Sequence, residues 1–389
     1  MSVYGIISEF NPFHNGHKYL FERARAEGAD KIVCVMSGNS VQRGEVALID
    51  KYKRAEMALT QGADLVLELP YPFCSASAER FAAAGVSIAS EFADTIFFGS
   101  ECGDINALFD AARVCVSDKF IEEYKSTLEC GAGTASAYFE LLEKSTGRKY
   151  LSNDILGIEY IKAALRMSSD VSFSTTSRLG GAYASSEISG GDLQSASAIR
   201  ALIYSGELER VKPYMPAECF DILRGAISKG EFTDTKKLDV AIRLYFRMCS
   251  PSDISECAEC DMGIASRICS AARECRDEDI MELLRTKRYT DARLRRAVMF
   301  ALSKTNRDDV ITLPAYTNLL AANACGRELL AQRRKNAKIA VLAKASDIPS
   351  TPDAQRQAEL SAKLDSIFAL ALKKEISPAD MLRRSPVIY

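Results

Sequence analysis

The two histidines of the 389-residue chain, His14 and His17, lie three positions apart near its start, with Gly16 between them. Imidazoles at this spacing share one side of a new helix and can donate hydrogen bonds to charge that builds on a bridging phosphate oxygen during nucleotidyl transfer. A glycine beside them lets the backbone approach a ligand, because it has no Cβ. A histidine at a helix start can also be only a cap or a surface residue, but the coincidence of these residues favours catalysis.

A second candidate is the segment 195–200, with hydroxyls at Ser195 and Ser197 and a guanidinium at Arg200. Hydroxyls at a helix start, with an arginine one turn inside, can hold the outer oxygens of a triphosphate. Alone, this is a common capping pattern. Together with the histidine turn it predicts the second half of one phosphate site, so we expect these two distant segments to meet around one triphosphate.

Alternating strands and helices in the first half must position these groups. Short apolar runs predict strands, and helical spacing between them predicts helices. This alternation predicts a parallel sheet covered on both faces, an α/β, Rossmann-like fold. Ligands bind beyond the carboxyl ends of such strands, so the loops at His14, Ser37 and Gly99 should converge on one crevice. The predicted strands are 3–7, 31–36, 65–69, 95–98 and 171–175, and the predicted helices are 18–27, 51–61 and 78–90.

Pro213 and Pro216 predict a domain boundary. Beyond them helical periodicity dominates, and we expect no strands. The chain is thus expected to form an α/β domain over residues 1–210 and a mostly α-helical domain over residues 211–389. Within the first domain, residues 104–142 have helical spacing and are expected to be a structural insertion.

The net charge of −2 is unevenly distributed. Residues 1–210 contain 20 Lys and Arg against 28 Asp and Glu, whereas residues 211–389 contain 30 against 24, so we expect the second half to meet a polyanion. Segment 286–296 concentrates cations around Tyr289, a pattern that suits phosphate contacts and base stacking, although most charge runs are solvated helix faces. Its cations are Lys287, Arg288, Arg293, Arg295 and Arg296.

Composition bounds the class of protein. With 47% hydrophobic residues the chain can bury a large core. It has neither a secretory signal pattern nor an apolar run near the ~20 residues that cross a bilayer, so we expect a soluble, cytoplasmic protein with no membrane partner. Most of the 12 cysteines sit in apolar patterns. A metal is conceivable at the cluster Cys257, Cys260, Cys269 and Cys275, but no histidine lies near it, so we expect none.

The His14–His17 pattern resembles the HxGH signature of the nucleotidylyltransferase superfamily. The fuller string SEFNPFHNGH is more specific and resembles the bacterial tRNA(Met) cytidine acetate ligase family. NDILGIEY at 153–160 and TKRYTDARLRR at 286–296 are similar to further segments of that family. SASAIR at 195–200 resembles the SxTxIR phosphate-binding motif, although an alanine stands where a second hydroxyl often sits.

The resemblance is looser over VMSGNSVQRGEVALIDKYKRAEMAL, residues 35–59, where Val46, Ala47 and Tyr52 depart from the family pattern. Arg43 and the cations Lys51, Lys53 and Arg54 of this segment would add positive charge beside the crevice, unless they form a solvated helix face.

The resemblance implies an ATP-dependent ligase that acts in two steps. Acetate attacks the α-phosphate of ATP to give acetyl-adenylate and pyrophosphate. The exocyclic amine of the wobble cytidine of elongator tRNA(Met) then takes the acetyl group as N4-acetylcytidine. Mg²⁺ is expected to accompany the nucleotide without a dedicated protein site, and no obligate protein partner is evident.

The resemblance also implies site residues. His14 and His17 would be catalytic, and the five cations of segment 286–296 would bind tRNA. The residues expected to bind ATP are Ile7, Ser8, Glu9, Phe10, Asn11, Pro12, Phe13, His14, Asn15, Gly16, His17, Lys18, Tyr19, Leu20, Gly99, Asn153, Arg178, Ser197 and Arg200.

Two other functions remain open from the residues. The same site could serve a small-molecule nucleotidylyltransferase of cofactor biosynthesis, although such enzymes rarely need a basic helical half. The chain could instead be a non-catalytic RNA-binding regulator that uses ATP as a structural ligand, a reading that the presence of both histidines disfavours.

Overall fold

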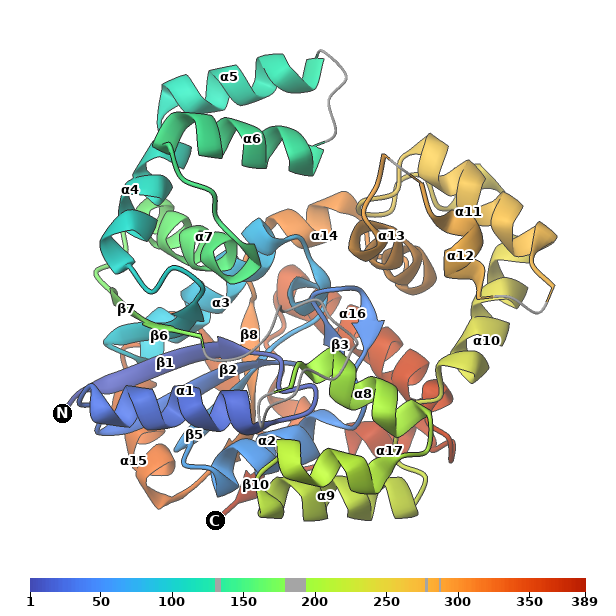
Figure 1. The fold of residues 1–389 in the computed structure, drawn as a ribbon. Helices are drawn as coiled ribbons and strands as arrows, with labels where there is room; N and C mark the ends of the chain where they lie inside the picture. The colour runs from blue at the N-terminus through green and yellow to red at the C-terminus, as the bar shows by residue number, and fades with distance from the viewer. Residues whose placement is uncertain (130–133, 179–193, 277–278, 287) are drawn as a thin grey trace.

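A mixed sheet runs through the centre of the protein, and its strands come from both halves of the chain (Figure 1). The computed structural model describes residues 1–129, 134–178, 194–276, 279–286 and 288–389. The strand order is β10-β8-β5-β2-β1-β6-β7, and β9 pairs with β8. The strands are β1 (Val3–Ser8), β2 (Lys31–Ser37), β5 (Leu65–Leu69), β6 (Thr95–Ser100), β7 (Ser172–Ser177), β8 (Tyr316–Ala322), β9 (Ala340–Leu342) and β10 (Val387–Ile388), with a separate hairpin of β3 (Ser40–Val41) and β4 (Glu45–Val46).

The predicted α/β fold is confirmed. Strands β5, β2, β1, β6 and β7 run parallel to one another and correspond to the five predicted runs. Their order reverses between β1 and β6, which makes the carboxyl ends of these two strands the topological switch point of a doubly wound sheet. Ser8 and Gly99, at these ends, therefore mark the expected place of a ligand.

The expectation that no strands follow Pro216 is wrong. β8 lies antiparallel to β5, and β9 and β10 lie parallel to β8. The sequence of β8, YTNLLAA, is rich in Leu and Ala, which favour helices in isolation. Pairing with the edge of β5 overrides that preference, as is common for strands. The boundary at residue 210 stays a prediction, although the sheet draws strands from both sides of it.

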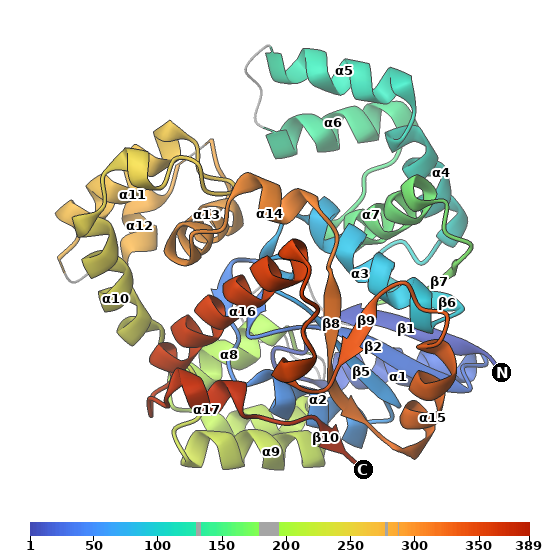
Figure 2. The same ribbon diagram turned by 180° about the vertical axis from the view of Figure 1, so that it is seen from behind.

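Helices cover both faces of the sheet and form two outlying groups, as the two opposite views show (Figures 1 and 2). The helices are α1 (Asn15–Ala26), α2 (Lys51–Thr60), α3 (Ala78–Phe92), α4 (Ile105–Cys115), α5 (Asp118–Glu129), α6 (Thr134–Thr146), α7 (Ser152–Met167), α8 (Ala196–Tyr204), α9 (Ala217–Ser228), α10 (Thr235–Met248), α11 (Met262–Glu274), α12 (Ile280–Leu284), α13 (Asp291–Ser303), α14 (Arg307–Ile311), α15 (Ala324–Arg333), α16 (Pro352–Ala371) and α17 (Pro378–Leu382). Short 3-10 helices span Phe73–Ser75, Leu208–Tyr214, Pro251–Asp253 and Ala345–Asp347.

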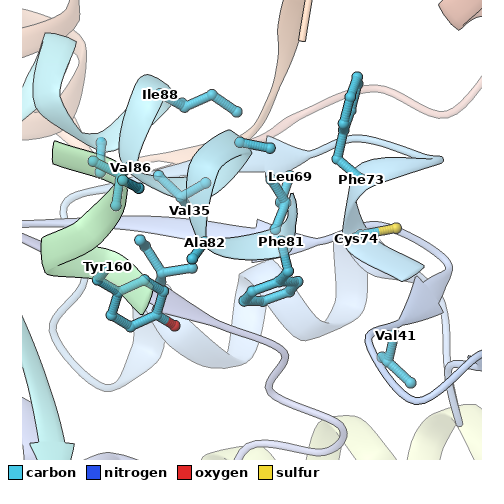
Figure 3. Packing of buried hydrophobic residues seen from close by; sticks show 14 of the residues in the cluster. Val35, Val41, Leu69, Phe73, Cys74, Phe81, Ala82, Val86, Ile88 and Tyr160 are labelled. Carbon is cyan, nitrogen blue, oxygen red and sulfur yellow. The ribbon is translucent and has the colours of Figure 1, made fainter. Parts of the chain in front are cut away.

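The alternation of side chains along the strands creates two cores. In β2, Val33 and Val35 pack in one core with residues of α3 and α7, part of which Figure 3 shows. Ile32, Cys34 and Met36 point to the other face and pack with residues of α1, α2, α8 and α9. A strand whose residues are all buried on both faces reads as a continuous apolar run, and that is why these strands could be predicted.

Helices α10 to α13 form a lobe with its own core, in which all four cysteines of the predicted cluster are buried. Burial raises the pKa of Cys257, and it raises that of Cys260 to about 12, so both are protonated, apolar side chains at neutral pH. Over the residues that the structure describes, no group of three or more His, Cys, Asp and Glu side chains is arranged to hold a metal ion.

Candidate active site

A cavity lies at the switch point, beyond the ends of β1 and β6. Its wall contains the strand end Ser8, the turn residue Gly99, both histidines and residues of α7 and α8. Two buried polar atoms of this region, Ser8 Oγ and Asn11 Nδ2, have no hydrogen-bond partner. Buried polar groups normally find partners, so these two atoms are suited to contact a polar ligand.

The two histidines cap the helix that they open. His14 is the N-cap of α1, and its Nδ1 accepts a hydrogen bond from the backbone N–H of Gly16 at 3.0 Å. His17 Nδ1 accepts the backbone N–H of His14 at 3.2 Å. This is the reciprocal arrangement of a capping box, with imidazoles in place of a hydroxyl and a carboxylate. The rings stack with centroids 3.8 Å apart. The cap interpretation and the catalytic one are therefore compatible, because each ring uses only one nitrogen for the cap.

This geometry fixes the protonation of both rings. In each ring Nδ1 accepts a hydrogen bond from a backbone N–H group, so the proton of the neutral imidazole is on Nε2. Burial, with Arg178 and Arg200 nearby, lowers the pKa of His14 to about 3. Burial and the adjacent His14 lower the pKa of His17 well below its ordinary value. At neutral pH both histidines are neutral hydrogen-bond donors through Nε2.

Gly16 is required by the His14 ring. A Cβ at position 16 would lie 2.8 Å from His14 Cε1 and 3.0 Å from Nδ1, too close for either atom. The sequence predicts that this glycine lets a ligand approach the backbone, whereas in the structure it makes room for the His14 imidazole, which lines the cavity. Gly16 itself does not line the cavity.

Aromatic side chains support His17 from behind. Phe10 meets the His17 ring edge-on with centroids 4.9 Å apart, and Phe13 lies 5.4 Å away. Phe10 is fully buried at a φ of 44°, in the left-handed region that a bulky residue rarely adopts. Such backbone costs about 1–3 kcal/mol and persists where packing enforces it, often at functional sites. Phe10 and Phe13 thus hold the ring in place.

The second predicted segment meets the first. Ser195 is the N-cap of α8, and its side chain accepts the backbone N–H of Ala198. Arg200 donates to the backbone oxygen of Asn11 at 2.9 Å, although 189 positions separate them. Ser197 and Arg200 line the same cavity as both histidines. The predicted meeting of the two segments is confirmed, and the triphosphate between them stays a prediction.

Asn153 lines the cavity, and Glu101, a residue that the sequence did not single out, holds its side chain there. Leu151 is the N-cap of α7, and Asn153 lies in the first turn of that helix. Its side chain donates to Glu101 Oε1, and its Oδ1 accepts from Arg178 at 3.3 Å. Glu101 also accepts the backbone N–H groups of Asn153 and Asp154, at 3.0 and 2.9 Å. A carboxylate at the start of α7 therefore fixes the side chain that faces the site.

Most of the residues expected to bind ATP line this cavity, and six do not. Those in its wall are Ile7, Ser8, Glu9, Phe10, Asn11, His14, His17, Leu20, Gly99, Asn153, Arg178, Ser197 and Arg200. Outside it are Pro12, Phe13, Asn15, Gly16, Lys18 and Tyr19. Asn15, for example, donates to the backbone oxygen of Pro213 at 2.9 Å. Consecutive residues of a turn point in different directions, so a contiguous stretch cannot all face one ligand.

Glu45 is the most informative residue that the sequence did not single out. One oxygen of its carboxylate lies 3.4 Å from Arg200 Nη2, and the other lies 3.0 Å from Arg295 Nη1. The neighbouring Gly44 packs closely against α13: a Cβ at this position would lie 2.4 Å from the backbone nitrogen of Arg296. The predicted cavity residue Arg200 and the predicted RNA residue Arg295 thus share one carboxylate.

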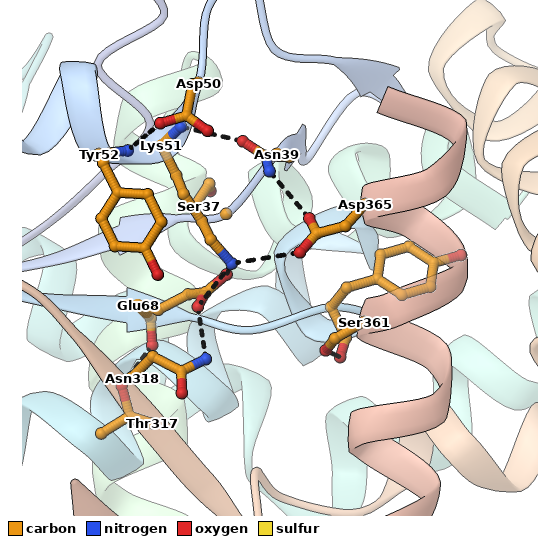
Figure 4. A network of polar contacts seen from close by, with 12 residues as sticks. Ser37, Asn39, Asp50, Lys51, Tyr52, Glu68, Thr317, Asn318, Ser361 and Asp365 are labelled. Atoms are coloured by element: carbon orange, nitrogen blue, oxygen red, sulfur yellow. Dashed lines mark hydrogen bonds and ion pairs between the residues drawn. The ribbon is translucent and has the colours of Figure 1, made fainter. Parts of the chain in front are cut away.

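Three of the cations expected beside the crevice have other roles. Lys51 is buried in a polar network, 2.9 Å from Glu68 and 3.7 Å from Asp365 of α16 (Figure 4). Burial alone would lower its pKa, but the two carboxylates outweigh burial and raise it well above its ordinary value. Fully buried Arg54 donates to backbone carbonyls, among them those of Glu9 and Ser37. Lys53 pairs with Glu231 at 3.1 Å. Among the four, only Arg43 lines the cavity.

The five cations expected to bind tRNA occupy different environments. Arg288 and Arg293 line a second, larger cleft beside α13. Arg296 also reaches that cleft but is buried and forms a bidentate pair with Glu259, at 2.7 and 2.8 Å. Arg295 is held by Glu45, as described above, and Lys287 lies outside the described residues. The tRNA contacts themselves stay a prediction.

Within the described ranges, no helix combines the length and the apolar composition that a bilayer crossing requires.

Comparisons with known proteins cover the whole chain. A family model described as HIGH Nucleotidyl Transferase matches residues 1–382. A tRNA(Met) cytidine acetate ligase of Clostridium perfringens is 35% identical over 375 residues, which are 90% of this chain and 92% of that protein. The protein of the same name from Listeria monocytogenes is 34% identical over 398 residues and all of both chains. The crystal structure of Thermotoga maritima TmcAL bound with alpha-thio ATP is similar with a TM-score of 0.91 and 30% identity, over 100% of this chain and 99% of that one.

Proposed function

The chain belongs to the tRNA(Met) cytidine acetate ligase family, and from this premise we propose that it activates acetate with ATP and acetylates N4 of the wobble cytidine of elongator tRNA(Met). It is an ATP-dependent ligase of the HIGH nucleotidyl transferase type. The observation that carries the proposal is the meeting of the histidine turn with α8 at the switch point, where Arg200 contacts Asn11 at 2.9 Å. A tRNA substrate would place its action in the cytoplasm.

In the first step, an acetate oxygen attacks the α-phosphorus of ATP, and the bond from that phosphorus to the bridging oxygen of pyrophosphate breaks. Negative charge builds on the bridging oxygen as pyrophosphate leaves. Neutral imidazoles with their protons on Nε2 suit this task, because His14 and His17 can donate hydrogen bonds from Nε2 to the developing charge while Nδ1 accepts in the helix cap. Donors held by a helix cap need no reorientation during the reaction.

Ser197, Arg200 and Arg178 supply the remaining groups for the phosphates. Arginine suits phosphate because its planar guanidinium can donate two parallel hydrogen bonds. Asn153, fixed by Glu101, and the backbone at Gly99 would face the nucleoside. A Cβ at position 99 would lie 3.0 Å from Arg178 Cγ, so the glycine also lets that arginine cross the strand end.

Mg²⁺ would accompany the nucleotide. Two carboxylates line the cavity: Glu9 accepts the backbone N–H of Gln42 at 2.9 Å, and Glu45 is shared by two arginines. Burial raises the pKa of Glu9. Neither is placed in a ready set of oxygen ligands, which fits an ion held chiefly by phosphate oxygens and water.

In the second step, the N4 amine of the cytidine attacks the carbonyl carbon of acetyl-adenylate. The bond from that carbon to the AMP oxygen breaks, the amine loses a proton to solvent, and AMP leaves. An acyl-adenylate hydrolyses in water, so a tRNA bound close to the cavity uses the intermediate before it is lost. The basic segment around Tyr289 is the candidate surface for that tRNA.

The test is a pair of assays on the purified protein. We expect pyrophosphate exchange into ATP that depends on acetate, and transfer of labelled acetate to purified elongator tRNA(Met). Pyrophosphate release with nicotinate or pantetheine phosphate, but not with acetate, would instead identify an enzyme of cofactor biosynthesis. Binding of ATP without turnover in any of these conditions would identify a regulator.

A further inference from the structure

We propose that the α5–α6 hairpin is the second wall of an RNA-binding cleft, and that a single-stranded segment of the substrate RNA lies between this hairpin and the Arg288–Arg293 segment. The inference rests on the proposed function, and it gives the hairpin a role beyond the structural one expected from sequence. Figure 1 shows the hairpin and the lobe of α11 to α13 on the same side of the sheet, facing one another.

The cleft between them is a cavity of about 700 Å³. One wall comes from α3, α5, α6 and α7, with Tyr124, Lys125 and Phe139 from the hairpin. The opposite wall comes from the start of α13 and the turn before it, with Arg288, Tyr289 and Arg293. The space is large enough for an unstacked nucleotide, whereas a small substrate would leave much of it unfilled.

The charge of the lining favours a polyanion. Six cations and two carboxylates line the cleft. Both carboxylates already have a cationic partner within the lining: Glu159 lies 2.8 Å from Lys162, and Glu79 pairs with Arg166. Outside the lining, Glu259 neutralises a third cation, Arg296. The lining still carries a net positive charge, which a phosphate backbone would complement.

Aromatic rings on both walls favour unstacked bases. Two guanidinium groups lie near the Tyr289 ring, with Arg288 at 5.3 Å and Arg293 at 4.7 Å from its centroid. Across the cleft, Phe139 is 45% exposed although it is a large apolar residue, and Tyr124 belongs to the same lining. Aromatic and guanidinium planes are the surfaces on which the bases of single-stranded RNA stack. A protein partner would call for a drier and less charged surface.

The cleft also lies close to the reaction site. Helix α7 separates the two cavities, so their distance is about the thickness of one helix, roughly 10 Å. Its residues Asn153, Leu156 and Tyr160 face the nucleotide cavity, and Ile155, Glu159 and Lys162 face the cleft. An RNA loop that offers one cytidine to the first cavity can thus place a neighbouring nucleotide in the second.

The experiment measures RNA affinity and acetyl transfer in hairpin variants of the full-length protein. Lys125→Glu should weaken binding of elongator tRNA(Met) by about 10-fold and flatten its salt dependence, because one phosphate contact is lost. Tyr124→Ala should also weaken binding by about 10-fold, and Tyr124→Phe should restore it, because stacking needs the ring and not the hydroxyl. Lys119→Glu is the matched control, since Lys119 lies on the same helix, exposed and outside the cleft lining.

Acetate-dependent pyrophosphate exchange without RNA separates this inference from the proposed function. The exchange should be unchanged in every hairpin variant, because the nucleotide cavity contains no residue of α5 or α6. The proposal that the hairpin binds RNA would be refuted if Lys125→Glu and Tyr124→Ala both kept the wild-type affinity for tRNA, or if Lys119→Glu lost as much affinity as they do. Absence of exchange in the wild-type protein would instead overturn the proposed function.

Discussion

The substitution Gly16→Ala should nearly abolish adenylate formation while leaving the protein folded. The added methyl group would lie 2.8 Å from His14 Cε1 and 3.0 Å from Nδ1, whereas carbon atoms in good contact are about 3.5–4.0 Å apart. The His14 ring must therefore move away from α1. It loses the 3.0 Å hydrogen bond from the Gly16 N–H and its stack on His17.

The expected effects on stability and on rate differ in size. Loss of the cap hydrogen bond costs about 0.5–1.5 kcal/mol, and alanine in place of glycine inside a helix returns roughly 0.8–1.0 kcal/mol. These two effects nearly cancel, so the free energy of unfolding should change little. Displacing one preorganised donor from developing negative charge costs about 100- to 1,000-fold in rate. The loss of rate should therefore far exceed the loss of stability.

Acetate-dependent exchange of pyrophosphate into ATP measures the rate, and urea unfolding measures the stability. Gly225→Ala is the matched control, because this helical glycine has no atom within 4 Å of an added Cβ. It should leave the exchange rate unchanged. The variant His14→Ala supplies the second test: with no ring to displace, adding Gly16→Ala should lower the rate no further.

Two results would refute this reasoning. A normal exchange rate in Gly16→Ala would mean that the His14 ring is not needed where the structure places it. A further fall when Gly16→Ala is added to His14→Ala would mean that the glycine acts on the ligand and not through the ring.

Three other perturbations test the site and its support. Because the pKa of His14 is lowered to about 3 in the folded protein, the unfolded chain binds more protons than the folded protein between pH 3 and about pH 6.5. The free energy of unfolding should therefore fall as the pH falls through this window, and His14 should contribute about 2 kcal/mol to that fall at pH 5. Urea unfolding of His14→Gln should show a smaller fall. Glu45→Gln should raise the KM for ATP several-fold more than it lowers kcat, because Arg200 loses a charged partner; steady-state kinetics that show an unchanged KM would remove Glu45 from the site. Lys51→Met should cost about 3–5 kcal/mol in urea unfolding, because Glu68 and Asp365 would stay buried without their cation, and a change below 1 kcal/mol would contradict this role.

The parallel strands and the histidine turn could be predicted because their signals are local. Continuous apolar runs such as β2 report burial on both faces, and the fold follows from their alternation with helices. The meeting of the histidine turn with the start of α8, where Arg200 contacts Asn11, could also be anticipated, because the residue types of both segments suit phosphate binding.

What could not be predicted depends on tertiary partners. β8 has a helix-favouring composition and becomes a strand by pairing with β5. Lys51 and Arg54 read as surface cations, because sequence does not reveal that Glu68, Asp365 and several carbonyl groups surround them. Leu156 and Tyr160 could have been found, since they follow Asn153 by three and seven positions and so share its helix face.

Glu45 pairs with both Arg200 and Arg295, and Gly44 packs closely against α13. These contacts limit which chimaeric enzymes can be made from two relatives. A chimaera that takes its first 210 residues from one relative and the remainder from another would join surfaces that were never selected together at this point. The chimaera should remain active only if the residues at positions 44, 45, 200 and 295 all come from the same parent. Substitutions at these four positions are therefore expected to be correlated between the two halves of the chain during evolution.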